Sequence, residues 1–373
     1  MKTDTDVLVG ERVVRLDTPT VAREPTRWRK PSRAHLLGLL GFAILALLPV
    51  PFGNFGFFVG QYAAVYTMLG LSVVVVTGYS GQVSLMPYSF AGIGAIVAGL
   101  AMASWGWPFW LTVPLAAAAT VPVSVLVGVS AVRLKGLYLA IATLTFANVL
   151  GETFFKWDSV TGGTFGWLVA RPAVGPIDFA SDAAFYVLCI GVVFVLLWMI
   201  EGLRTSRLGR AMIAVRDNEL EAQALGINVY KTKLVAFIIA GMLAGVGGAF
   251  LAALLSSVTR TAFQSPLAEA NSLLLVTLVA IGGIDRAVGA FFGAIAIVVQ
   301  QQVFQGAEFF FAFFGIYAAA VFIAFLLFRP GGIVQVLNIL VELTRRRPAL
   351  GIAVATGLVA VNVGVAYLFV SLS

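Results

Sequence analysis

The chain of 373 residues is too apolar for an ordinary soluble protein. Charged residues make up 11% of it and hydrophobic residues 60%, and the mean hydropathy is +0.98, whereas soluble domains carry about a quarter charged residues. The net charge of +7 is better explained by basic residues at the cytoplasmic ends of membrane spans than by nucleic-acid binding. We therefore expect a membrane protein with no nucleic-acid partner.

Apolar runs of roughly 20 residues, each long enough to cross a bilayer as a helix, recur along the chain. They predict an all-α polytopic membrane protein with about 10–11 transmembrane helices, the shorter run at 268–283 being a possible broken or re-entrant helix. The predicted spans are 34–52, 56–78, 84–104, 109–132, 136–155, 183–203, 234–256, 268–283, 287–305, 309–328 and 349–371.

Three regions follow from these spans: a cytoplasmic polar tail (1–33), a transmembrane domain (34–333), and a basic linker with an additional C-terminal transmembrane helix (334–373). With the tail in the cytoplasm, alternation of the spans leaves only Lys156, Arg171 and Arg260 of the 24 Lys and Arg residues on the outer side. Because cytoplasmic loops are enriched in Lys and Arg, this asymmetry predicts a multi-pass protein of the cell membrane with a cytoplasmic N-terminus.

The outer loop at 156–182 is unusually long and rich in Gly, Pro and Trp. It is either a packed connector or a docking or gating surface, since long loops are often functional.

Four polar residues share one face of the span at 136–155: Tyr138, Thr145, Asn148 and Glu152. A carboxylate and an amide are costly against lipid, so they should face the bundle interior, a partner helix or a wet cavity. We predict that these residues line the substrate pathway, with hydrogen bonding that joins the helices as the alternative.

Two G-x-x-x-G pairs, Gly241 with Gly245 and Gly289 with Gly293, predict close helix packing. A loose internal repeat relates residues 73–99 to residues 274–299: each runs from an apolar span through a glycine-containing turn into a glycine-rich helix. Repeated units are common in transporters.

Catalytic chemistry has no sequence support. The patterns G-x-x-x-x-G-K-[ST], H-E-x-x-H and G-x-S-x-G are missing from the sequence. The single histidine, His35, and the single cysteine, Cys189, cannot assemble a metal site. We expect no enzyme activity, no catalytic residues, no metal and no cofactor.

A charged segment, residues 204–233, separates two apolar spans. Its charged residues are Arg204, Arg207, Arg210, Arg216, Asp217, Glu219, Glu221, Lys231 and Lys233. A segment of this length is not needed merely to turn the chain, so it predicts a contact surface for another protein; a solvated loop on the membrane surface is the alternative. Its pattern favours a short amphipathic helix that ends at Gly226, with Ala and Gly on the surface so that a partner's groove can come close.

Motifs within roughly residues 55–333 resemble, in the same order, the LivM-type permease subunit of branched-chain amino acid ABC importers. They are GYSGQVSLMPYSFAGIGA, RLKGLYLAIATLTFANVL, KWDSVTGGTFG, GRAMIAVRDNELEAQALGINVYKTKLVAF, VAIGGIDRAVGAFFGA and FRPGGI. The resemblance implies an ABC importer permease bundle with two ATP-binding subunits, a second homologous permease subunit and an extracytoplasmic solute-binding protein. ATP would be used by the partner subunits.

By the same resemblance, the segment 204–233 is the coupling loop, which contacts the ATP-binding subunit. The candidate coupling residues are Gly209, Arg210, Arg216, Asp217, Asn218, Glu221, Ala222 and Gly226. The long tail and the span at 349–371 depart from the family pattern. The alternatives are a permease for urea or another small solute in the same family, and a stand-alone ion-coupled secondary transporter.

Overall fold

The computed structural model describes residues 6–9, 12–15 and 53–304, apart from 132, 135, 164, 175, 176, 265 and 266. The chain divides into two units, residues 1–47 and 48–373. In the first unit, β1 (Asp6–Val9) and β2 (Arg12–Arg15) form an antiparallel hairpin, within what we predicted only as a polar tail. The predicted spans at 34–52, 309–328 and 349–371 lie outside the described residues.

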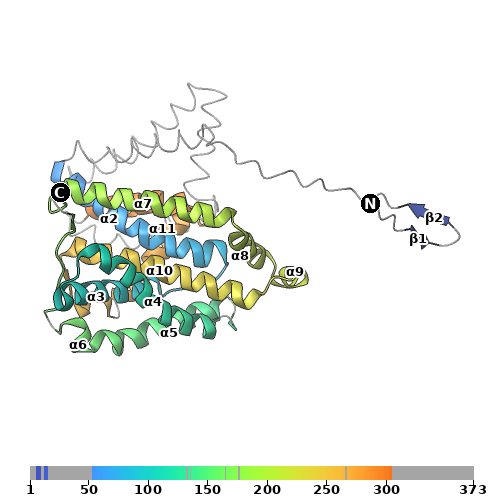
Figure 1. Cartoon of the computed structure of the whole chain (residues 1–373), viewed down its shortest axis with the longest axis horizontal. Coiled ribbons are helices and arrows are strands. Elements are labelled where there is room, and N and C mark those ends of the chain that lie inside the picture. The colour runs from blue at the N-terminus through green and yellow to red at the C-terminus, as the bar shows by residue number, and fades with distance from the viewer. Residues whose placement is uncertain are drawn as a thin grey trace, which may run out of the picture. The chain divides into compact units, whose positions relative to one another are not determined.

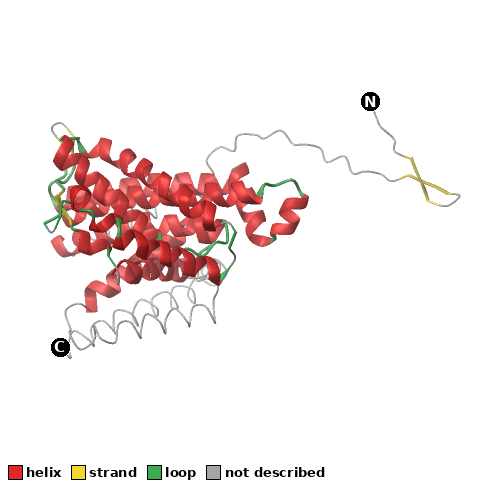
Figure 2. Ribbon diagram, turned by 90° about the horizontal axis from the view of Figure 1, so that it is seen from below, coloured by secondary structure: helices red, strands yellow, loops and turns green. Residues whose placement is uncertain are grey.

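The second unit is a bundle of helices (Figures 1 and 2). In chain order the elements are α2 (Gly53–Val73), the π-helix η2 (Val74–Tyr79), α3 (Pro87–Trp105), α4 (Phe109–Ala131), α5 (Leu137–Glu152), the 3₁₀ helix η3 (Phe154–Lys156), α6 (Asp158–Thr161), α7 (Asp182–Thr205), α8 (Arg207–Asp217), α9 (Glu219–Ala224), α10 (Val229–Leu255), the 3₁₀ helix η4 (Arg260–Phe263), α11 (Leu267–Gly282) and α12 (Ala287–Phe304).

Within the described residues, six helices are long and apolar enough to cross a bilayer, and α11 and α12 form a further pair bent by 114°. Six of the eight spans predicted between residues 56 and 305 correspond to these six helices, and the all-α polytopic fold is confirmed. The other two, 268–283 and 287–305, correspond to α11 and α12, which together make at most one further span. The bend between α11 and α12 agrees with the prediction that the run at 268–283 belongs to a broken or re-entrant span.

Helix α10 occupies the centre of the bundle, against α2, α3 and α4. Its glycines allow this close approach. A Cβ atom on Gly245 would lie 2.7 Å from the carbonyl oxygen of Ala116 in α4. A Cβ atom on Gly241 would overlap Ser124 in α4, and one on Gly248 would overlap Ala91 in α3. The pair Gly241 and Gly245 therefore packs inside this chain, and its surface is not free for another subunit.

The second glycine pair packs α12 against α11. A Cβ atom on Gly289 would overlap the carbonyl oxygen of Gly283, and one on Gly293 would overlap that of Leu278. Small residues at such crossings let helix backbones approach in a bilayer, where hydrophobic burial does not drive helix association.

The segment Ser80–Met86, between η2 and α3, is not helical although most of its side chains are buried. The N–H of Leu85, in this segment, donates to Oγ1 of Thr143 in α5 (3.0 Å). The N–H of Tyr88, in the first turn of α3, donates to Oγ of Ser272 in α11 (3.4 Å). Ser272 lies roughly 15 Å along α11 from its end at Gly282. Irregular backbone is tolerated at such depth where protein groups satisfy it.

The α8–α9 pair lies at one end of the bundle, which we call the coupling end, and α6 lies at the other, the far end (Figure 1). At the far end, β3 (Trp167–Leu168) pairs with β6 (Ser257–Val258), and β4 (Ala173–Val174) pairs with β5 (Ile177–Asp178). Arg171 binds the carboxylate of Asp182 at 2.8 Å and lies 5.3 Å from the ring of Phe185, which ties the loop at 156–182 to α7.

Candidate functional site

The predicted coupling loop, residues 204–233, which we continue to call by that name, contains two short helices, α8 and α9, where the sequence predicted one. Asn218 separates them because its extended backbone ends α8 and its side chain caps α9, accepting from the N–H of Leu220 at 3.0 Å. Its Oδ1 also accepts from the N–H of Glu221 at 3.4 Å, and its Nδ2 donates to the Glu221 carboxylate at 2.7 Å, so both ends of the amide hold the first turn of α9.

Gly226 ends α9, as the sequence predicted for the helix stop. It has a φ of +80°, and the N–H groups of Gly226 and Ile227 donate to the carbonyls of Gln223 and Ala222, both at 2.9 Å. This Schellman arrangement requires a left-handed residue after the helix, which glycine adopts without strain.

Two predicted coupling residues are buried inside the loop, contrary to the expectation that Ala and Gly would lie at its surface. Ala222 is 1% exposed and packs with Val215 and Val229. Gly209 lies where a Cβ atom would overlap the carbonyl oxygen of Leu203 at the end of α7. Both residues hold the coupling loop together and cannot themselves contact a partner.

Arg216 joins the coupling loop to the bundle. Its Nη1 donates to the carbonyl oxygen of Gly78 at 2.6 Å and to the carboxylate of Asp285 at 2.7 Å. Gly78 belongs to η2 and Asp285 to the turn between α11 and α12. The guanidinium therefore bridges the ends of two different membrane helices.

These two turns belong to the loosely repeated segments 73–99 and 274–299. They lie in contact, since a Cβ atom on Gly78 would overlap the carbonyl oxygen of Ile284. Gly81, with a φ of +70°, comes equally close to the coupling loop: its Cβ atom would lie 2.7 Å from Cγ of Arg216. Both turns are thus within direct reach of α8.

A second connection runs through an ion pair between Lys233 at the start of α10 and Glu219 of α9, at 2.6 Å. The side chain of Lys233 is only 5% exposed. Glu219 is partly exposed, at 27%, so removing it would leave the buried ammonium group of Lys233 without its partner, which is costly. The pair therefore fixes the position of α9 relative to α10.

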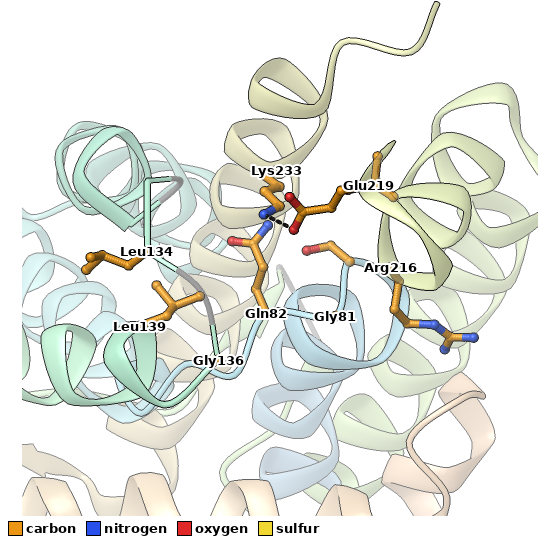
Figure 3. A pocket seen from close by; sticks show the side chains of 10 residues that line it. Gly81, Gln82, Leu134, Gly136, Leu139, Arg216, Glu219 and Lys233 are labelled. Carbon is orange, nitrogen blue, oxygen red and sulfur yellow. Dashed lines mark hydrogen bonds and ion pairs between the residues drawn. The ribbon is translucent and has the colours of Figure 1, made fainter. Parts of the chain in front are cut away.

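A cavity of about 60 Å³ adjoins this ion pair. Its lining combines the segment Ser80–Gln82 with Arg216, Glu219 and Lys233 and with residues at the start of α5. Figure 3 shows the side chain of Gln82 reaching up towards the ion pair. Gln82 is 3% exposed, and neither its Oε1 nor its Nε2 has a hydrogen-bond partner in the described part of the chain.

The outer surface of the coupling loop carries two leucines that the sequence analysis did not single out. Leu220, in α9, is 76% exposed, and Leu225, directly after α9, is 78% exposed. The predicted residues Arg210, Asp217, Asn218, Glu221 and Gly226 are also exposed. A charge count could not find the leucines; only the helix geometry shows which apolar residues point away from the bundle.

The polar residues of α5 do not face the bundle interior. Tyr138 is 76% exposed, Thr145 and Glu152 are exposed, and Asn148 is half-buried. Glu152 pairs with Lys156 one turn later. The bundle interior is therefore excluded as their surroundings. The other two surroundings predicted from the sequence, a partner helix and a wet cavity, remain.

The sequence matches the family described as "Branched-chain amino acid transport system / permease component" over residues 57–328. The chain belongs to this family. The matched region includes every described helix of the bundle from residue 57 onwards and contains the whole coupling loop.

Curated relatives support the assignment. The chain is 27% identical over 300 residues to the high-affinity branched-chain amino acid transport system permease protein LivM of Salmonella typhimurium, covering 74% of this chain and 69% of that protein. It is 28% identical over 267 residues to LivM of Escherichia coli strain K12, covering 65% of this chain and 61% of that protein.

A more distant relative is the ribose import permease protein RbsC of Escherichia coli strain K12, 32% identical over 135 residues, which covers 36% of this chain and 39% of that protein. No solved structure matches the chain. The relatives are transport permeases and not enzymes, and the chain is a multi-pass membrane protein.

Proposed function

We propose that the chain is the transmembrane permease subunit of an ABC importer that carries branched-chain amino acids across the cell membrane. The observation that carries this proposal is the coupling loop: a folded pair of helices with exposed leucines, fixed by Arg216 to two turns of the membrane bundle. Family membership and the similarity to LivM support the substrate class.

The driving force comes from outside this chain. Separate ATP-binding subunits, two in the complete importer, hydrolyse ATP and dock on the coupling loop, so this chain itself needs no cofactor. The coupling end is then cytoplasmic, in agreement with the excess of Lys and Arg that the sequence places on that side, and the N-terminus is cytoplasmic too. An extracytoplasmic solute-binding protein delivers the amino acid to the far end.

A second homologous permease covers the exposed face of α5. Thr145, Asn148 and Glu152 would be costly against hydrocarbon, and α5 is the least buried of the membrane-spanning helices in the described residues. The substrate pathway runs along this face, between the two permeases, where the carboxylate of Glu152 can hold the ammonium group of an amino acid briefly.

Changing Glu152→Gln or Asn148→Ala should therefore alter the rate or selectivity of uptake while the complex stays assembled. The measurement combines labelled leucine uptake with the yield of intact complex from the same membranes. If these side chains only join helices, assembly will fall in step with uptake. Normal uptake kinetics in both variants would show that α5 does not line the substrate pathway.

Competition for uptake tests the substrate class. In proteoliposomes that contain the complete importer, unlabelled isoleucine and valine should suppress the ATP-driven uptake of labelled leucine. Ribose, which the RbsC similarity brings into question, and urea should leave it unchanged at the same concentration. Suppression by ribose or urea but not by valine would reassign the importer to another solute.

A further inference from the structure

Three separate parts of the chain meet at the cavity beside Lys233 and Glu219. Gln82 comes from the segment between η2 and α3, Glu219 from α9 and Lys233 from α10. Each of these elements is also part of the connection between the coupling loop and the bundle. A side chain at this junction is placed to respond when the coupling loop moves.

The size and charge of the cavity indicate what occupies it. A volume of about 60 Å³ is well below the roughly 150 Å³ of an engineered cavity that binds benzene, so a branched-chain amino acid does not fit. The opposite charges of Lys233 and Glu219 already neutralise each other, so an ion has no favourable site. Water remains, since one molecule needs only about 10–15 Å³ and a few polar partners.

Gln82 supplies those partners. Its amide donor and acceptor are both buried and have no hydrogen-bond partner among the described residues, and buried polar groups are almost always hydrogen-bonded to protein or to ordered water. The backbone of Gln82 is itself fixed: its N–H donates to Val76 at 3.0 Å and its carbonyl accepts from Oγ1 of Thr77 at 3.1 Å. Because the backbone of Gln82 is held in this way, a displacement of its amide is passed on to the segment that carries it.

We propose that Gln82 is a positioning residue for coupling, an inference that rests on the proposed function. In the present conformation its amide reaches the Lys233–Glu219 pair through water. When ATP binding moves the coupling loop, the water leaves and the amide binds the pair directly, so that the segment Ser80–Met86 and α3 follow the loop. Arg216 connects the coupling loop to the bundle in both conformations, whereas the connection through Gln82 changes between them.

Two substitutions separate this role from simple packing. Gln82→Leu keeps the volume and removes the amide, whereas Gln82→Asn keeps the amide on a shorter side chain. Replacing the buried amide and its water by an apolar side chain of similar volume should be nearly neutral for the fold, so Gln82→Leu should be about as thermally stable as the parent. Its uptake per ATP hydrolysed should nevertheless fall roughly tenfold, the factor expected from one hydrogen bond to a charged group. Gln82→Asn should retain more uptake per ATP than Gln82→Leu.

The experiment uses the complete importer in proteoliposomes and measures labelled leucine uptake and phosphate release together. Ser89→Ala is the matched control, because the Ser89 hydroxyl is also buried without a partner in the part of the chain that the structure describes, but does not line the cavity; its uptake per ATP should be unchanged. A packing role predicts the opposite order, with Gln82→Leu better than Gln82→Asn, and that order would overturn the proposal. Failure of both variants to assemble would overturn it as well.

The parent protein distinguishes this inference from the function on which it rests. If the unsubstituted importer shows no ATP-driven leucine uptake, the proposed function is wrong. If the parent transports leucine and Gln82→Leu transports equally well per ATP, only the role of Gln82 is wrong.

Discussion

Replacing both exposed leucines of α9 by aspartate should abolish ATP-driven uptake. Leu220 and Leu225 are each more than three-quarters exposed, and an apolar anchor in a protein interface commonly contributes about 2 kcal/mol or more. Two buried carboxylates in place of two such anchors should prevent docking of the ATP-binding subunit. Copurification of a tagged ATP-binding subunit with the permease measures docking directly, and uptake in the same preparation measures its consequence.

Gln223→Asp is the control for this experiment, because it adds one carboxylate, half the charge of the double variant, to an exposed position of α9 without removing apolar surface. It should reduce copurification far less than the double leucine variant. Normal copurification and normal uptake in the double variant would show that α9 is not the docking surface.

Changing Gly248→Leu should prevent the bundle from forming. Even a Cβ atom at this position would overlap the backbone carbonyl oxygen of Ala91 in α3, and a backbone cannot rotate away as a flexible side chain can. Overpacking of an adaptable core costs about 1–3 kcal/mol, and this site should exceed that range. Size-exclusion profiles and thermal unfolding of the detergent-solubilised protein will show the loss.

Gly191→Leu in α7 provides the matched control. A Cβ atom at Gly191 has no described residue within 4 Å, so the same substitution should leave the bundle intact and even favour the helix slightly. If the two glycine variants behave alike, the backbone of α10 at Gly248 does not lie in contact with the backbone of α3 at Ala91.

Helices could be predicted from the sequence because hydrocarbon thickness fixes their length. The runs at 109–132 and 183–203 correspond to α4 and α7 within a few residues. The segment Ser80–Met86 was predicted less well: the expected span at 84–104 begins only at Pro87. Hydropathy cannot identify this irregular segment, because the N–H of Leu85 depends on Thr143, which is far away in the sequence.

The candidate site required the three-dimensional structure for the same reason. Ala222 and Leu220 are both apolar residues of one short helix, and composition does not tell which is buried and which is exposed. Arg216 was predicted as a coupling residue, but the sequence could not show its partner Gly78, which lies 138 positions away. The internal repeat did contain the useful signal, since the two similar turns meet at this arginine.

Dependence of uptake on a separate ATPase tests the central claim most directly. Proteoliposomes containing this chain, the second permease and the ATP-binding subunits should accumulate leucine only when ATP is supplied on the side of the coupling loop and the solute-binding protein on the other. Liposomes containing this chain alone should accumulate none under a sodium or proton gradient. Gradient-driven accumulation by the chain alone would contradict the account.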